Sequence, residues 1–449
     1  MDKRKVKKAN KRPYNARKAE VEIKKLGING EGIGYINKKI CFVDNALPSE
    51  VVEIEILEET RKYYKGKVIR TIKESKHREE TFCKEDTTCL GCALTRLAYP
   101  KQLSFKKDLL KDALKKYTTF DVESLPIKRT YASPVKKGYR NSVALPITYF
   151  NGKVLAGIYQ RETKYLTFMN KCPMQNDLIN ETIVKIEDIL NKHGVRDYND
   201  KIKRGLRFMR LRNVANKIQV LFVTGTDGMK QEVVDDLKQI ESIVSIFYTI
   251  NTTRYQEFEA QGYAKLHGNS KVAYKFYDQQ YLYSIKSEFP VNPEMEKTKM
   301  DIIKSFINED ESVISLNCGI GVMELSMDNE IVAIDPKNYH IQDAEENMKF
   351  LRKSNVKFLC KDIDEAVVTQ CKKKHFDVLV LRHDEMSRAV KQSMILSKIN
   401  KVIYVCDHPS SLAKDLEELK DNYTIEVMIP LDMNPYSAKV ETVVKLVRK

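Results

Sequence analysis

The sequence predicts a multidomain chain with a small N-terminal β-barrel, a mixed α/β middle region and a C-terminal α/β domain built on a parallel sheet. Two observations predict this arrangement. Residues from about 20 to 77 alternate apolar and polar side chains with a period of two, whereas apolar strand segments after residue 290 are separated by helix-length segments. With 449 residues and a hydrophobic fraction of 42%, the chain can supply two or three cores.

The first element is a basic tail, residues 1–19. Residues 1–18 hold nine Lys or Arg against the single acid Asp2, out of a net charge of +16 for the whole chain. Such a segment has too few apolar side chains to fold alone, so we expect disorder until it meets a polyanion such as RNA. A solubilising tail without a specific partner is the alternative.

The second element is a barrel over residues 20–77. Residues 52–56 (VEIEI) alternate as a half-buried strand does, and Gly30, Gly32 and Gly34 mark turns. Several short strands within sixty residues are typical of an oligonucleotide-binding (OB-like) barrel. Residues 62–67 interleave Tyr and Lys, a mixture that suits base stacking and phosphate contact.

The middle region, residues 78–285, contains a helical apolar spacing over about 100–116 and then mixed strands and helices. Its cysteines carry more information. Cys83, Cys89 and Cys92 are spaced C-x5-C-x2-C, and Cys172 follows before a proline. Four thiolates hold either a [4Fe–4S] cluster or a structural zinc ion, and a triplet with a remote fourth cysteine is more typical of clusters. Four buried free thiols are the alternative.

The C-terminal region, residues 286–449, is predicted to form a parallel sheet covered by helices on both faces. Ligands bind such sheets beyond the C-terminal ends of the strands, so the residues that follow each strand are candidate site residues. The strand candidates are 313–316, 331–334, 378–381 and 402–405.

Two exclusions complete this description. The sequence contains no run of eighteen apolar residues, and its basic N-terminus is not followed by the apolar segment of a signal peptide. We therefore expect a cytoplasmic protein with no membrane partner, whose cysteines do not form a disulfide framework.

Ordered motifs over the chain from about residue 20 resemble the S-adenosylmethionine-dependent RNA uracil-C5 methyltransferases, closest to their 23S ribosomal RNA branch. The motifs are GINGEGIGYINKKICFVDNALPSE at 27–50, CKEDTTCLGCALTRLAYPKQLSFK at 83–106, YRNSVALP at 139–146, LNCGIG at 316–321, YVCDHPSSLAKDL at 404–416 and LDMNPYSAKVETVVKL at 431–446. The resemblance implies a TRAM barrel, a class I (Rossmann-like) methyltransferase domain, and a structural [4Fe–4S] cluster on the four cysteines. It also implies a monomer that binds ribosomal RNA or ribosomal particles.

The chemistry implied by the resemblance requires a cysteine that adds to C6 of a flipped-out uracil. That register reads Asp407 here, and Cys406 stands at the preceding position. Neighbouring strand residues face opposite sides, so Cys406 would need a local rearrangement to act as the nucleophile. The family's Asp-Pro-Pro-Arg loop reads Arg382-His383-Asp384-Glu385, so the acid that holds the uracil has become a base.

The implied cofactor residues are retained in part. Gly319, Gly321, Asp335 and Asp362 match the family's S-adenosylmethionine pocket, and Glu441 matches its general base. However, the first-strand acid is Ser315, an amide near the cofactor is Pro290, and the histidine beside the base is Lys439.

Three hypotheses follow. The leading one is an RNA-binding member of this family that is catalytically impaired. The second is an active RNA 5-methyluridine methyltransferase that uses Cys406 and Glu441. The third is an iron–sulfur RNA-binding protein whose cluster senses oxidation.

Overall fold

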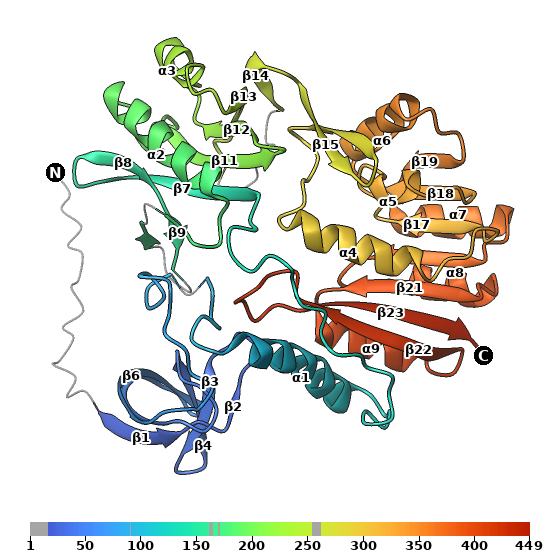
Figure 1. Ribbon diagram of the computed structural model, residues 1–449, viewed down its shortest axis with the longest axis horizontal. Helices are drawn as coiled ribbons and strands as arrows, with labels where there is room; N and C mark the ends of the chain where they lie inside the picture. Colours follow the sequence, from blue (N-terminus) through green and yellow to red (C-terminus); the bar gives the residue numbers. More distant parts are fainter. Residues whose placement is uncertain (1–16, 90, 161–164, 169–170, 254–261) are drawn as a thin grey trace, which may run out of the picture. The chain divides into compact units, whose positions relative to one another are not determined.

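The computed structural model describes residues 17–89, 91–160, 165–168, 171–253 and 262–449. The expected basic tail therefore lies almost entirely outside the described residues. The chain divides into two compact units (Figure 1). The first comprises residues up to 82 with 91–102 and 436–438, and the second comprises 83–90, 103–435 and 439–449.

The first unit contains the predicted barrel as a six-stranded sheet in the order β1-β5-β6-β4-β3-β2. In β5, Val52, Ile54 and Ile56 are buried while the intervening glutamates face outward, which confirms the predicted alternation. The strands are β1 (Lys18–Glu22), β2 (Lys25–Leu26), β3 (Gly32–Ile36), β4 (Lys39–Asp44), β5 (Val51–Glu59) and β6 (Tyr63–Lys73).

The predicted helix is α1 (Tyr99–Tyr117). Its apolar face packs on a different region of the chain from the middle region to which the predicted domain division assigned it. Leu110 and Leu114 belong to the core of the C-terminal sheet, and Ile127 further along pairs with Met428 of that sheet. Lys106 forms a buried ion pair with Asp432. Residues from 103 to about 131 thus pack with the C-terminal sheet rather than with the middle region. Helical spacing reveals an apolar face but not which sheet it covers.

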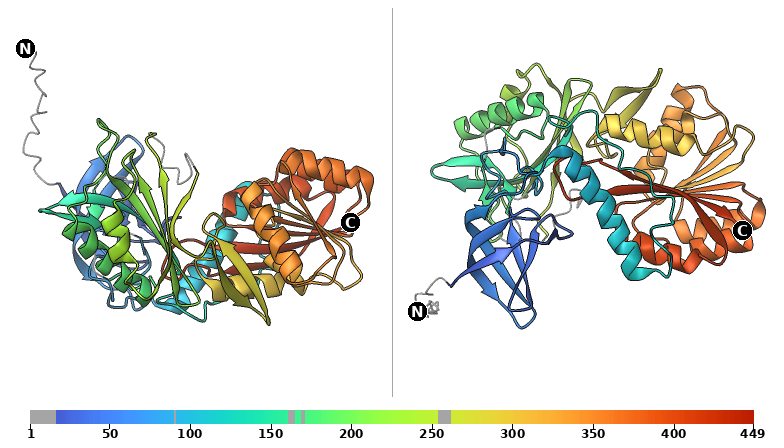
Figure 2. Two further views of the ribbon diagram at one scale, coloured as in Figure 1. Left: turned by 90° about the horizontal axis from the view of Figure 1, so that it is seen from above. Right: turned by 60° about the horizontal axis from the view of Figure 1, so that its bottom comes forward.

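The middle region of the second unit is a six-stranded sheet in the order β14-β13-β12-β11-β7-β8. Helices α2 (Asp177–Lys192) and α3 (Gln231–Leu237) share one core with this sheet, on one of its faces (Figure 2). The β9–β10 hairpin accompanies it, whereas the β15–β16 hairpin packs into a core of the C-terminal sheet. The strands are β7 (Ser142–Phe150), β8 (Lys153–Ala156), β9 (Ile158–Tyr159), β10 (Leu166–Thr167), β11 (Leu206–Val214), β12 (Lys217–Thr224), β13 (Ile243–Ile250), β14 (Ala264–Gly268), β15 (Lys271–Phe276) and β16 (Gln279–Ser284).

The C-terminal region is a seven-stranded sheet in the order β19-β18-β17-β20-β21-β23-β22 (Figure 1). The first five strands of that order run parallel, and β23 lies antiparallel to both of its neighbours. The four predicted strands are confirmed, because apolar runs of this length are what a doubly covered sheet buries. The strands are β17 (Val313–Leu316), β18 (Ile331–Asp335), β19 (Val356–Cys360), β20 (Val378–Arg382), β21 (Lys401–Cys406), β22 (Tyr423–Leu431) and β23 (Glu441–Arg448).

Two separate cores lie on the two faces of this sheet. One core, with Tyr404 and Cys406 of β21, packs against α7, α8 and α9. The other, with Ile403 and Val405 of β21, packs against α4, α5 and α6. The helices are α4 (Pro293–Lys304), α5 (Val322–Leu325), α6 (Asn338–Phe350), α7 (Ile363–Lys373), α8 (Arg388–Leu396) and α9 (Pro409–Leu419). Among the described residues, every helix is too short or too polar to cross a bilayer.

Candidate functional site

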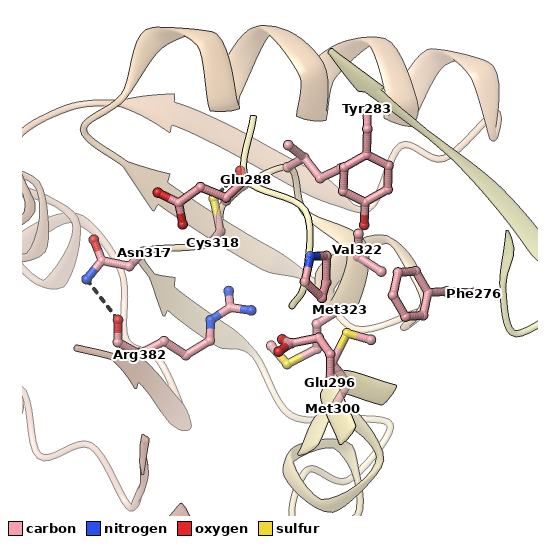
Figure 3. A pocket seen from close by; sticks show the side chains of 13 residues that line it. Phe276, Tyr283, Glu288, Glu296, Met300, Asn317, Cys318, Val322, Met323 and Arg382 are labelled. Carbon is pink, nitrogen blue, oxygen red and sulfur yellow. Dashed lines mark hydrogen bonds between the residues drawn. The ribbon is translucent and has the colours of Figure 1, made fainter. Parts of the chain in front are cut away.

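A cavity of about 170 Å³ lies beyond the C-terminal ends of β17 and β20 (Figure 3). This is where open α/β sheets bind ligands. Most of the apolar lining residues belong to the core on the α4–α6 face of the sheet. The cavity is lined by Phe276, Tyr283, Glu288, Pro290, Glu296, Met300, Asn317, Cys318, Gly319, Ile320, Val322, Met323 and Arg382.

The turn after β17 has the backbone that its glycines predict. Gly319 and Gly321 have φ of 58° and 75°, a left-handed conformation that costs side-chain-bearing residues free energy. A Cβ on Gly321 would lie 2.5 Å from the Phe358 ring, whereas one on Gly319 would meet no atom within 4 Å. Gly319 therefore borders the cavity, and Gly321 allows close packing behind it.

Asp335, the predicted ribose-binding acid, is buried at the end of β18 and its carboxylate is already occupied. It accepts hydrogen bonds from the Gly319 N–H at 3.0 Å and the Lys337 N–H at 2.9 Å, and lies 3.0 Å from His340 Nδ1. Burial favours the neutral acid, but these contacts outweigh it and lower the pKa of Asp335 overall. Asp335 thus fixes the glycine turn from behind the cavity wall.

Asp362, the predicted adenine-side acid, is the N-cap of α7. Its carboxylate accepts the N–H groups of Asp364 and Glu365 at 3.0 and 3.1 Å, as an N-cap does. Within the described part of the chain, Gly319 is the one of the four predicted cofactor residues that lines the cavity.

Arg382 ends β20, and its side chain reaches the cavity (Figure 3). Its guanidinium forms an ion pair with Glu324 of α5, whose side chain is fully buried. The Ser315 hydroxyl donates to Glu324 Oε1 at 2.6 Å and lies 3.3 Å from Arg382 Nη2. Burial lowers the pKa of Arg382, but Glu324 outweighs this and raises it overall.

Glu324 is the one member of this cluster that the sequence reasoning missed. Its signal was an acid within the short apolar segment after the glycine turn, where a buried helix face is expected. Among the described residues, Glu324 Oε2 and Arg382 Nε are buried without a hydrogen-bond partner. Such atoms mark a polar site that is not fully satisfied by its own side chains.

Glu441, the predicted base, is the first residue of β23 and is held in an ion-pair network. Lys299 of α4, itself buried, lies 3.0 Å from Glu441 and 2.9 Å from Glu296, which lines the cavity. Burial lowers the pKa of Lys299, but the two carboxylates outweigh it and raise it. Lys299, which is charged, therefore links Glu441 to Glu296 of the cavity lining.

Cys406, the candidate nucleophile, is 2% exposed and belongs to the core on the α7–α9 face. Its thiol donates to the Asp384 carbonyl at 3.2 Å, and burial raises the pKa of Cys406 to about 11. Most of the apolar cavity-lining residues belong instead to the core of the opposite face, as strand alternation requires.

Asp407, at the register of the expected nucleophile, is exposed and belongs to a cluster of titratable groups. His408 Nδ1 lies 2.5 Å from Asp407 and 3.3 Å from Asp384. Burial and the neighbouring Asp384 raise the pKa of Asp407. Burial lowers the pKa of His408, but the two carboxylates outweigh it, so the pKa is raised overall.

Three of the four predicted metal ligands, Cys83, Cys89 and Cys172, belong to the second unit, whereas Cys92 belongs to the first. Burial raises the pKa of the Cys83 thiol, and Cys172 and Cys89 raise it further because neighbouring thiolates repel one another. Asn180 fixes Cys172 by accepting its N–H at 3.0 Å. Cys89 and Cys172 therefore lie within electrostatic range of Cys83.

The sheet order and the position of the cavity define a class I methyltransferase fold. A TRAM domain model matches residues 12–69. The solved structure of Pyrococcus abyssi tRNA (uracil-54, C5)-methyltransferase, in complex with S-adenosyl-L-homocysteine, superposes with a TM-score of 0.76. That likeness covers 96% of this chain and 100% of that chain at 21% identity, and it establishes the fold.

Relatives extend this likeness to sequence. A Bacillus cereus protein named "Uncharacterized RNA methyltransferase" is 30% identical, with 96% of each chain covered. A similarly named Enterococcus faecalis protein is 29% identical, with 96% of this chain and 97% of that protein covered. The chain belongs to the family of TRAM-domain RNA methyltransferases.

Proposed function

We propose that this chain is an RNA-binding member of the uracil-C5 methyltransferase type that has lost methyl transfer. The observation that carries the proposal is the end of β21, where Asp407 stands at the nucleophile register and the adjacent thiol of Cys406 is buried on the other face. A carboxylate is a weaker nucleophile toward C6 of uracil than a thiolate. With a pKa of about 11, Cys406 is a thiolate in only about one molecule in 10⁴ at pH 7.

The cavity does not fit S-adenosylmethionine, by two observations. Its volume of about 170 Å³ is below the roughly 300–1,000 Å³ of most small-molecule sites. The carboxylates of Asp335 and Asp362 already accept hydrogen bonds from backbone N–H groups of their own domain.

RNA remains the proposed partner, because the family acts on RNA and the parts that hold it persist. These parts are the TRAM domain, the basic tail and the four cysteines, and ribosomal RNA or ribosomal particles are the proposed targets. The spacing of Cys83, Cys89 and Cys92, with Cys172 before a proline, supports a [4Fe–4S] cluster, with zinc as the alternative. Such a group, when bound, supplies structural crosslinking rather than chemistry.

The test combines binding and product analysis on anaerobically purified protein. Calorimetric titration with S-adenosylmethionine is expected to give no binding heat, while ribosomal RNA binds. Mass spectrometry of nucleosides from RNA incubated with the protein and S-adenosylmethionine is expected to show no new 5-methyluridine. Iron and zinc content, measured for the wild type and for Cys83→Ser, identifies the metal.

One observation favours an active enzyme as the second candidate: Glu441 is linked to the cavity through Lys299 and Glu296. This candidate requires 5-methyluridine that disappears in Cys406→Ala. Such a result would overturn the proposed loss of methyl transfer, whereas the RNA-binding assignment would stand.

A further inference from the structure

Solvent-exposed aromatic side chains concentrate in one short part of the middle region. Among the described residues, seven aromatic side chains are strongly exposed, and four of these lie between positions 149 and 165. They are Tyr149, Phe150, Tyr159 and Tyr165. Exposed apolar side chains gathered in one place mark an interaction surface, whereas scattered ones do not.

Two neighbouring hairpins display these residues. Phe150 ends β7, and its ring stacks on Phe168 with centroids 5.3 Å apart and an interplanar angle of 24°. Phe168 follows β10 of the β9–β10 hairpin, which the Gly157 N–H joins to β7 by donating to the Pro146 carbonyl at 3.1 Å. The close approach depends on Gly157, since a Cβ there would lie 3.2 Å from the Phe168 ring.

Strand alternation places Tyr159 on the same side of the hairpin as Phe168. Tyr159 pairs with Leu166, and Phe168 is two residues further along, so both point to one face. The opposite face is turned inward, because Thr167 is buried and Ile158 packs on the core of the middle sheet. We name Phe150, Phe168 and Tyr159 the aromatic platform.

The charge around the aromatic platform is positive. Within 149–171, the charged side chains that the structure describes are Lys153 and Lys171, and both are cationic. Lys153 is exposed and pairs with Phe150 across the β7–β8 hairpin. On the other face of β7, Arg196 lies over the Tyr149 ring at 4.1 Å. Bases stack on aromatic rings and phosphates pair with cations, so a surface that carries both kinds of side chain fits a single-stranded nucleic acid.

We propose that the aromatic platform stacks unpaired bases of a single-stranded RNA segment while Lys153 contacts its phosphates. This inference rests on the proposed RNA binding and assigns part of it to the β7–β8 and β9–β10 hairpins. Base stacking on aromatic side chains tolerates any sequence, since every base has a π-face. The platform therefore selects single strands over duplexes rather than one base over another.

The test measures binding of a fluorescent 12-nucleotide single-stranded RNA by anisotropy, from low to high salt, with a 12-base-pair RNA duplex as competitor. Phe150→Ala is expected to weaken single-strand binding about tenfold. The slope of log Kd against log salt stays unchanged, because no phosphate contact is lost. Lys153→Ala is expected instead to reduce that slope by roughly 0.7.

Phe350→Ala is the matched control, because Phe350 ends α6 and is 53% exposed against 49% for Phe150. It is expected to bind as the wild type does. Tyr159→Ala, at 41% exposure, serves as the second platform variant. Thermal unfolding of each variant reports that the fold persists.

The outcomes separate this inference from the proposed function. If the wild type binds the single strand and both platform variants bind equally well, the aromatic platform is not an RNA surface, while RNA binding stands. If the duplex competes as well as the single strand, base stacking is also refuted. If the wild type binds neither RNA, the proposed function itself fails.

Discussion

Arg382→Met tests the buried ion pair that closes the cavity. The substitution keeps an unbranched side chain of moderate length but removes the charge that faces Glu324, whose side chain is fully buried. Removing one partner of a buried ion pair costs about 3–5 kcal/mol, because the remaining charge is left in a low-dielectric site. For a domain of this size the Tm falls by roughly 6–20 °C.

The pH dependence of this variant identifies Glu324 as the cause. Without Arg382, Glu324 is a buried carboxylate that has lost its opposite charge, and burial favours the neutral acid. Protonation then removes the uncompensated charge, so the lost stability is regained as the pH falls. The wild type, in which the pair is intact, is expected to show no such recovery.

The measurement is calorimetric unfolding between pH 5 and 8. Lys374→Met is the matched control, since it removes the same kind of charge from the solvent-exposed pair with Glu330 in the same sheet domain and costs at most about 1 kcal/mol. The double variant Arg382→Met/Glu324→Leu is expected to recover most of the stability, because apolar replacement of a buried pair is often neutral. An Arg382→Met protein as stable as Lys374→Met would refute the buried pair.

Three further predictions follow from the same domain. Native-state alkylation at pH 8, followed by mass spectrometry, should modify the exposed Cys360 rapidly. Cys406 should react at least about 100-fold more slowly, because its thiol is buried and its pKa is raised. Equal rates would contradict the buried thiol. The raised pKa of His408 should add stability that is present below its unfolded pKa of about 6.5 and lost as the pH rises through the folded value. Unfolding of the wild type and His408→Asn from pH 5 to 9 checks this, because parallel curves would remove the role of Asp407 and Asp384. Gly321→Ala should lower the free energy of unfolding more than Gly319→Ala does. Both substitutions carry the cost of positive φ, about 1–2 kcal/mol, but only a Cβ at Gly321 also meets Phe358. Chemical denaturation of the two variants decides the order.

Local pattern determined much of the architecture. The strands at 313–316, 331–334, 378–381 and 402–405 were predicted correctly from apolar runs alone, and the helix near 100–116 from its spacing. The same holds for β5, whose alternation follows from having one buried face. In each case the information is carried within a few residues, because a strand or helix buries side chains at a fixed period.

For the candidate site residues, the sequence likewise predicted positions along the chain but not the contacts that the side chains make. Gly319 and Arg382, which motif register singled out, both line the cavity. Register did not reveal that the carboxylates of Asp335 and Asp362 are satisfied by nearby N–H groups. A motif specifies where a side chain is attached, but not which neighbours satisfy its hydrogen-bonding groups.

Only the tertiary structure decided how distant residues combine. Arg382 and Glu324 are 58 positions apart and meet because parallel strands bring the ends of β17 and β20 to one edge of the sheet. The same packing assigned α1 to the C-terminal sheet, Cys406 to the face away from the cavity, and Lys299 to Glu441. The sequence by itself determined the periods and the substituted motifs. The fold decided which buried charges pair with one another. A buried charge has lost its contact with water, so only the groups that packing brings beside it can stabilise it.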